Sequence, residues 1–146
     1  MSEYIPSKAA WVRDQVELYE SSNGAEGTTI GDPGLPVIIV THRGRNTGAI
    51  RKTPLMRAVD GPNYILVASL AGAPDNPSWY YNLVSNPEVE IRDKSVVTSM
   101  RVSEVSEPTE KKRLWDIAVK AYPPYAEYQD KTDRVIPLFI ATPADG

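Results

Sequence analysis

The 146-residue chain has no cysteine and a single histidine, His42. Without cysteine it cannot form disulfide bonds, use a thiol nucleophile or hold a metal through sulfur ligands. One histidine also excludes a metal centre built from several imidazoles, and no Gly-x-Ser-x-Gly motif of a serine hydrolase accompanies it. We therefore expect neither a metal site nor a nucleophilic centre of these kinds.

Long apolar runs are missing as well. The longest apolar stretch, residues 35–40, is far too short to span a bilayer. The N-terminal residues are polar and lack the apolar core of a secretion signal. We expect a cytoplasmic protein, and the sequence leaves open a peripheral membrane contact through the N-terminal helix.

Acidic residues are absent from residues 33–59, a stretch of 27. The net charge of the chain is −3, and outside this stretch 11 Lys and Arg face 19 Asp and Glu. Cations gathered on a glycine-containing turn of an acidic protein favour a local site for a phosphate or a carboxylate. The alternative is a solvated hairpin turn, and the negative net charge argues against a nucleic-acid partner. The five cations of the stretch are Arg43, Arg45, Arg51, Lys52 and Arg57.

The hydrophobic periodicity predicts two parts. Residues 1–34 are expected to form an N-terminal helix over residues 7–20 and a flexible linker rich in Gly, Ser and Thr. On this helix Val12, Val16 and Tyr19 share one face. Residues 35–146 are expected to form the main domain.

About six short, mostly antiparallel strands and peripheral helices are expected in the main domain. Few long crossovers separate the strands, so an α+β antiparallel barrel fits better than a doubly wound sheet. The strands are expected at residues 35–41, 52–60, 64–69, 89–92, 96–105 and 135–142, with helices at residues 77–84 and, capped by Ser106, from there to about residue 122.

Two aromatic groups can serve either a core or a ligand. Trp79 is four residues before Leu83 on the short helix, which suits core packing, but it could also cover a planar ring. Tyr122, Tyr125 and Tyr128 recur every three residues, so they share one side of a tight helix. They form either the edge of a core or the wall of a pocket. An anion site and stacking residues, without a nucleophile or a metal, indicate chemistry done by an organic cofactor.

Six blocks of the sequence form one further pattern. The blocks are Gly44-Arg45-x-Thr47-Gly48-x-x-Arg51-Lys52-x-Pro54-Leu55, Ala68-Ser69, Asn76-Pro77-x-Trp79-Tyr80-x-Asn82-Leu83, Asn86-Pro87-x-Val89, Tyr122-Pro-x-Tyr125-x-x-Tyr128-Gln129 and Asp133-Arg134-x-Ile136-Pro137. In this order they resemble the deazaflavin (coenzyme F420)-dependent nitroreductase family. The resemblance covers residues 35–143, most of the chain.

This resemblance implies a split β-barrel of the FMN-binding type and coenzyme F420, which carries a phosphate and a polyglutamate tail. It places the phosphate and tail against Arg45, Thr47, Gly48, Arg51 and Lys52, with Arg43, Asn46 and Thr53 also in contact with the cofactor. It places the deazaflavin ring against Pro54, Leu55, Ala68 and Ser69, with Trp79 beside it.

The resemblance also implies hydride transfer to a small electron-poor acceptor such as a quinone, an enone or a nitro compound. Tyr122, Tyr125, Tyr128 and Trp79 would line the acceptor side, and a hydroxyl of Tyr125, Tyr128 or Ser69 would support the anion that forms on the acceptor. An FMN-dependent reductase of the same barrel and a non-enzymatic binding module remain alternatives. The protein would be a monomer or a homodimer.

Overall fold

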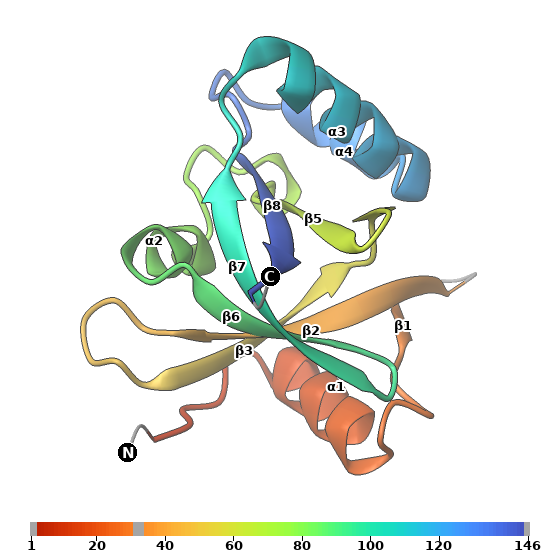
Figure 1. Cartoon of the computed structure of the whole chain (residues 1–146), viewed down its shortest axis with the longest axis vertical. Coiled ribbons are helices and arrows are strands. Elements are labelled where there is room, and N and C mark those ends of the chain that lie inside the picture. Colours follow the sequence, from red (N-terminus) through yellow and green to blue (C-terminus); the bar gives the residue numbers. More distant parts are fainter. Residues whose placement is uncertain (1–2, 31–33, 145–146) are drawn as a thin grey trace.

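An antiparallel sheet curls around the main core, and helices flank it on several sides (Figure 1). The structure is a computed structural model that describes residues 3–30 and 34–144. In these ranges the strands are β1 (Thr29–Ile30), β2 (Leu35–Arg43), β3 (Ile50–Met56), β4 (Val59–Asp60), β5 (Asn63–Val67), β6 (Glu88–Asp93), β7 (Val96–Glu104) and β8 (Leu138–Pro143). The helices are α1 (Ala10–Ser21), α2 (Ser78–Ser85), α3 (Pro108–Ala121) and α4 (Pro124–Asp130), with a 3₁₀ turn, η1 (Leu70–Gly72).

The order of the strands is β1-β2-β6-β7-β8-β5-β4, and β3 pairs with β2 outside this path. All the strand pairings in the described ranges are antiparallel, and β2 pairs with strands before and after it in the chain. This is the helix-flanked split barrel that the sequence predicted, so the expected α+β fold class is confirmed.

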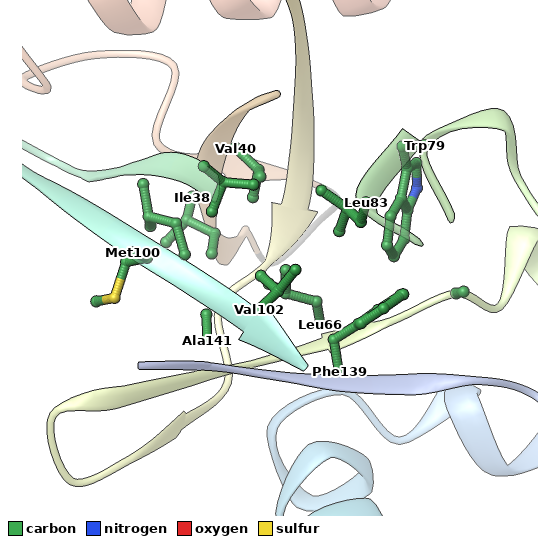
Figure 2. Packing of buried hydrophobic residues seen from close by; sticks show 12 residues of the cluster. Ile38, Val40, Leu66, Trp79, Leu83, Met100, Val102, Phe139 and Ala141 are labelled. Atoms are coloured by element: carbon green, nitrogen blue, oxygen red, sulfur yellow. The ribbon is translucent and has the colours of Figure 1, made fainter. Parts of the chain in front are cut away.

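Strand β2 is buried on both faces. Ile38 and Val40 point into the main core, which also contains Leu66 and Phe139 (Figure 2). The alternate residues Val37 and Ile39 pack instead on α1. Side chains of a strand alternate between its two faces, so the continuous apolar run of β2 follows from its position between two clusters.

Helix α1 packs through the face expected from the sequence. Val16 and Tyr19 are buried, and Val12 lies against the same cluster. The Tyr19 hydroxyl donates to the Val37 carbonyl at 2.9 Å and accepts from the Lys94 N–H at 2.7 Å. The segment expected to be a linker contains β1, which pairs with β2. The boundary between residues 34 and 35 stays a prediction.

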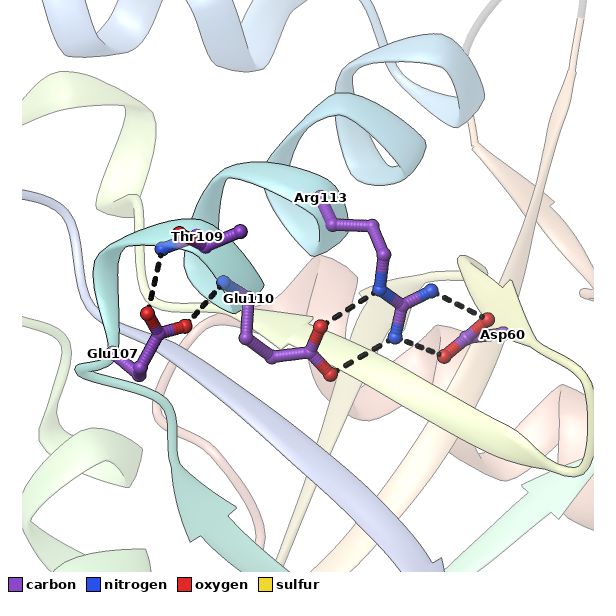
Figure 3. A network of polar contacts seen from close by, with 5 residues as sticks. All are labelled: Asp60, Glu107, Thr109, Glu110 and Arg113. Atoms are coloured by element: carbon purple, nitrogen blue, oxygen red, sulfur yellow. Dashed lines mark hydrogen bonds and ion pairs between the residues drawn. The ribbon is translucent and has the colours of Figure 1, made fainter.

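Three elements differ from expectation. The strand expected over residues 52–60 is two strands, because the chain leaves β2 after Met56 and pairs as β4 with β5. The α3 cap is Glu107, not Ser106, since the Glu107 carboxylate accepts from the N–H groups of Thr109 and Glu110 (Figure 3). The tyrosine-rich segment forms an α-helix, α4, rather than the tighter helix that a spacing of three residues suggested.

An arginine on α3 ties this helix to the sheet. The Arg113 guanidinium donates to both carboxylate oxygens of Asp60 and of Glu110 (Figure 3). The apolar face of α3, with Leu114 and Ala118, packs beside β5 and β8. There it forms a second core cluster with Ala58, Ile65, Val67, Tyr125, Ile136 and Leu138. None of the helices in the described part of the chain is long and apolar enough to cross a membrane.

A buried polar chain joins the β2–β3 hairpin to α2. His42, 3% exposed, lies 3.0 Å from the Thr53 hydroxyl through Nε2 and 3.4 Å from the Asn82 amide nitrogen through Nδ1. The Asn82 oxygen accepts from the backbone N–H and the guanidinium of Arg45. Asn82 therefore presents its NH₂ group to Nδ1, which leaves the proton of a neutral imidazole on Nε2, where it donates to Thr53.

Burial, helped by the positive charge of Arg51, lowers the pKa of His42 to about 4. Since the pKa of an unfolded histidine is about 6.5, the unfolded state takes up the proton first on acidification. The contribution of neutral His42 to the free energy of unfolding is complete above pH about 6.5. It is lost as the pH falls towards 4, by about 3 kcal/mol in total.

We therefore expect NMR to show the His42 imidazole as the Nε2–H tautomer, and the ring to stay neutral down to pH about 5. Because the chain has one histidine, its signals need no assignment by mutation. The free energy of unfolding should fall between pH 6.5 and 4, and this fall should be smaller in His42→Gln. An imidazole that titrates near pH 6.5 would show that the polar chain does not exist in solution.

Candidate functional site

Two adjoining cavities lie where the β2–β3 hairpin meets the first turn of α2. Their volumes are about 310 and 180 Å³, and they share Arg51, Ser78 and Asn82, so they form one cleft. The larger cavity is also lined by Ile5, Gly44, Arg45, Asn46 and Thr47, and the smaller by Ser7, Val12, His42, Lys52, Thr53 and Trp79.

The hairpin turn presents its backbone to this cleft. Gly44 N–H donates to the Ala49 carbonyl, and Gly48, with φ of 72°, donates to the Gly44 carbonyl. This left-handed conformation, rather than a lack of space, requires glycine at position 48, because nothing lies within 4 Å of its missing side chain. The N–H groups of Asn46 and Thr47 take part in no hydrogen bond between described residues. They are donors of the kind that a phosphate accepts from.

The cations that the sequence assigned to the anion site differ in their surroundings. Arg51 lines both cavities, and its guanidinium has no hydrogen-bond or ion-pair partner among the described residues. Arg45 donates to Asn82 and to the Ser78 carbonyl and lies 5.2 Å from the Tyr81 ring centre. Its charge remains available because neither partner is acidic.

The other cations are less available to the cleft. Arg57 forms an ion pair of 2.8 Å with Asp93 and does not line the cleft. Arg43 lines a larger hollow of about 610 Å³, which shares His42 and Lys52 with the smaller cavity and is also bordered by two carboxylates, Glu88 and Glu90. We consider this hollow a poorer anion site than the cleft despite its larger volume, since its acids offset its cations.

A wall of the cleft comes from the N-terminal residues, which the sequence did not indicate. Ile5 N–H donates to the Ile50 carbonyl at 2.9 Å, and Ile50 N–H donates to the Glu3 carbonyl at 2.7 Å. The Tyr4 ring lies over the Lys52 ammonium at 5.0 Å. Glu20, at the end of α1, holds the same ammonium with both carboxylate oxygens at 2.7 Å. Glu20 is far from the cation-rich stretch in sequence, and no local pattern connects the two.

Most of the residues expected beside the ring lie further along the sheet. Pro54 is buried on β3, Leu55 packs on the main core, and Ala68 and Ser69 are buried after β5. None of these four lines the two cavities. Trp79 does line the smaller cavity, and it also packs on Phe139 at 6.2 Å, so both of its expected roles are compatible with the structure.

Arg134 holds the turn after β5. Its guanidinium donates to the carbonyls of Ala68, Ser69 and Ala73 and to the Asn76 side chain, at 2.7–3.1 Å. These contacts connect the turn that carries Ser69 with the loop that leads into α2. Arg134 appears in the Asp-Arg-x-Ile-Pro block, but that pattern alone assigned it no role.

The three tyrosines come together on α4 and just before it. The hydroxyls of Tyr122 and Tyr128 lie 3.0 Å apart, and the Tyr125 ring packs edge-on against Tyr122 at 4.9 Å. The hydrogen bond from Tyr122, with partial burial, raises the pKa of Tyr128 to about 12, and burial raises that of Tyr125. Tyr125 and Tyr128 are therefore protonated at neutral pH and able to donate.

Tyr125 differs from its neighbours because its ring is buried but its hydroxyl is not sealed. The side chain is 5% exposed and belongs to the second core cluster. Its hydroxyl has no hydrogen-bond partner among the described residues, in which every sealed polar side-chain atom has one. The hydroxyl therefore reaches accessible space. The tyrosines do not line the cleft, although α4 contacts the η1 turn that follows Ser69.

Comparisons with known proteins agree on one family. The family model for F420H(2)-dependent quinone reductase matches residues 11–143. The F420H(2)-dependent quinone reductase Rv1261c of Mycobacterium tuberculosis strain H37Rv is 36% identical over 132 residues, which cover 86% of this chain and 85% of that protein. The solved structure of an F420-H2 dependent reductase, FDR-A, has a TM-score of 0.69 and 44% identity, covering 73% of this chain and 93% of that chain.

A second solved structure, described as a domain-swapped dimer, has a TM-score of 0.71 and 40% identity, and covers 92% of this chain and 99% of that chain. With a family model that spans most of the sequence and a curated relative at 36% identity, the chain belongs to the F420H(2)-dependent quinone reductase family and is an F420H2-dependent reductase whose cofactor is coenzyme F420.

Proposed function

We propose that this reductase transfers a hydride from reduced F420 to a quinone. The support for the acceptor is that the matching family and the curated relative both carry the name of quinone reductases. Enones and nitro compounds, which the sequence left open, have no comparable support. Membership of an F420-dependent family also sets aside the FMN-dependent and non-enzymatic alternatives.

The cleft is our proposed site for the anionic end of the cofactor, and Arg51 is the observation that carries this proposal. Arg51 lines both cavities, and its guanidinium has no acidic partner among the described residues. Arg45, Lys52 and the N–H groups of Asn46 and Thr47 would complete a phosphate and carboxylate site with Gly48 and Thr53 beside them. Arg43 lies outside this cleft and would act only through its charge.

The ring of the cofactor is proposed to lie between this cleft and the tyrosines, bordered by Pro54, Leu55, Ala68, Ser69 and Trp79. When bound, reduced F420 supplies the hydride. The protein would orient the acceptor and exclude water, which accounts for much of the catalytic effect in reactions without a protein nucleophile. Arg134 would keep Ser69 in place through its bond to the Ser69 carbonyl.

As the hydride reaches the quinone, negative charge develops on a quinone oxygen, and a phenol can stabilise that charge by donating a hydrogen bond. Tyr125 is our preferred donor because its hydroxyl has no other described partner. In the Tyr122–Tyr128 pair the two hydroxyls already form a hydrogen bond with each other. Transfer of one proton to the oxygen then completes the two-electron reduction to the hydroquinone.

We also propose that the protein is a homodimer, rather than the monomer that the sequence left equally open. The support is the likeness to the structure described as a domain-swapped dimer, which covers 92% of this chain. Sedimentation equilibrium measures the mass directly, and a mass of about 16.1 kDa at micromolar concentration would refute the proposal.

Arg51→Ala should weaken the binding of F420 by about tenfold or more, because a charge-assisted hydrogen bond is worth about 1.5–3 kcal/mol. Added salt should weaken binding to the wild type more than to the variant. A fluorescence titration of the deazaflavin measures both effects. Lys112→Ala, which removes an exposed charge on α3, is the matched control. Equal affinities of wild type and Arg51→Ala would place the anionic end of the cofactor elsewhere.

Tyr125→Phe should lower the rate at which a quinone oxidises bound, reduced F420 by about ten- to a hundredfold, while the affinity for F420 stays the same. Stopped-flow absorbance follows this step. Tyr80→Phe, which removes a hydroxyl that donates to Glu104, controls for the loss of a phenol elsewhere. If only Tyr128→Phe slows the step, the donor belongs to the Tyr122–Tyr128 pair instead.

A further inference from the structure

One cation of the cleft already has an anionic partner within the chain. The Lys52 ammonium is held by both oxygens of Glu20 at 2.7 Å, and the side chains are 21% and 29% exposed. The Tyr4 ring lies over the same ammonium. Lys52 is thus enclosed by N-terminal residues, whereas Arg51, its neighbour on β3, has no acidic partner among the described residues.

Buried contacts other than the ion pair also hold α1 on the sheet. The residue before Glu20, Tyr19, is fully buried and its hydroxyl bonds to Val37 and Lys94. Val16 packs on the same face of the sheet. A partly exposed ion pair contributes little to stability beside such packing. The carboxylate of Glu20 therefore has its main effect on the charge of the cleft.

That effect is to reduce the positive charge available to an incoming anion. The glutamyl tail of F420 ends in carboxylates, which are chemically the same group as the Glu20 side chain. A tail carboxylate that approaches Lys52 must either replace Glu20 or bind beside it against like-charge repulsion. Both routes weaken the binding of the tail and leave the binding of the ring unchanged.

Building on the proposed cofactor site, we propose that Glu20 is a specificity-determining residue, which competes with the carboxylates of the glutamyl tail for Lys52. It acts on the tail rather than on the phosphate or the ring, since Arg51 and the hairpin turn are not paired with it. The protein would therefore discriminate little between F420 molecules with long and short tails, although its cleft is cationic.

Glu20→Gln is the sharpest test, because the amide keeps the size of the side chain and can still accept a hydrogen bond from Lys52, but it carries no charge. We expect the variant to bind F420 with its glutamyl tail about three- to tenfold more tightly than the wild type. The affinity for the tail-free form that keeps the phosphate should not change. In a Lys52→Gln background the gain should disappear.

Glu17→Gln is the matched control, since it removes one exposed acid from the same helix a turn earlier. An equal gain in this control would assign the effect to net charge and overturn the proposal. An equal gain for the tail-free form would mean that the variant opens the cleft rather than frees Lys52. Unchanged or weaker binding of tailed F420 would show that Glu20 only positions Lys52.

Failure of the underlying site has a different signature. If Arg51→Ala binds each form of the cofactor, tailed or tail-free, as tightly as the wild type does, the cleft does not hold the anionic end. Both proposals then fall. If Arg51→Ala weakens binding but Glu20→Gln leaves it unchanged, the site stands and the competition by Glu20 is refuted. Melting temperatures of all variants without cofactor separate these effects from loss of folding.

Discussion

Burial of β2 on both faces is the constraint on which the rest of the structure depends. Its residues alternate between the main core, through Ile38 and Val40, and the α1 cluster, through Val37 and Ile39. A shift of register by one residue would exchange these faces, so the strand has one acceptable position. That position determines where the strand ends, and there it carries His42 and the cationic hairpin turn.

From this end the polar contacts extend across the molecule in steps. The Asn82 amide connects the hairpin to α2, and Arg134 connects the loop before α2 to the turn that carries Ser69. The missing side chain of Gly72 leaves room for the Tyr128 backbone, because a Cβ there would lie 2.7 Å from its carbonyl oxygen. The cation-rich cleft and the tyrosine cluster are therefore joined by a short series of well-defined contacts, although the tyrosines line neither of the two cavities of the cleft.

The sequence predicted what depends on local pattern. Periodicity placed Val16 and Tyr19 on the buried face of α1, and the order of short strands predicted an antiparallel barrel with helices. It failed where partners are distant in the chain. Residues 33–59 contain no acid, but two of their cations pair with acids from other elements. Glu20 of α1 pairs with Lys52, and Asp93 of β6 pairs with Arg57. A count of charges along the chain cannot show which of them fold against an acid.

Side-chain roles were hardest to predict where one residue satisfies several backbone groups. Arg134 donates to three carbonyls that are about sixty residues earlier in the chain, a role that no spacing encodes. Glu107 caps α3 although serine at position 106 is the usual choice. Here Pro108 occupies the first helical position, which suits its missing N–H and makes the preceding residue the cap.

The N-terminal residues that border the cleft also protect an exposed strand. In the described ranges β3 pairs only with β2, so its other side is an open edge that could join the sheet of another molecule. The backbone of Glu3 and Ile5 covers this edge at Ile50, and Pro54 offers no N–H further along it. Loss or displacement of the first residues would therefore expose a template for intermolecular strand pairing, so the same short segment that shapes the cleft also guards against edge-to-edge aggregation.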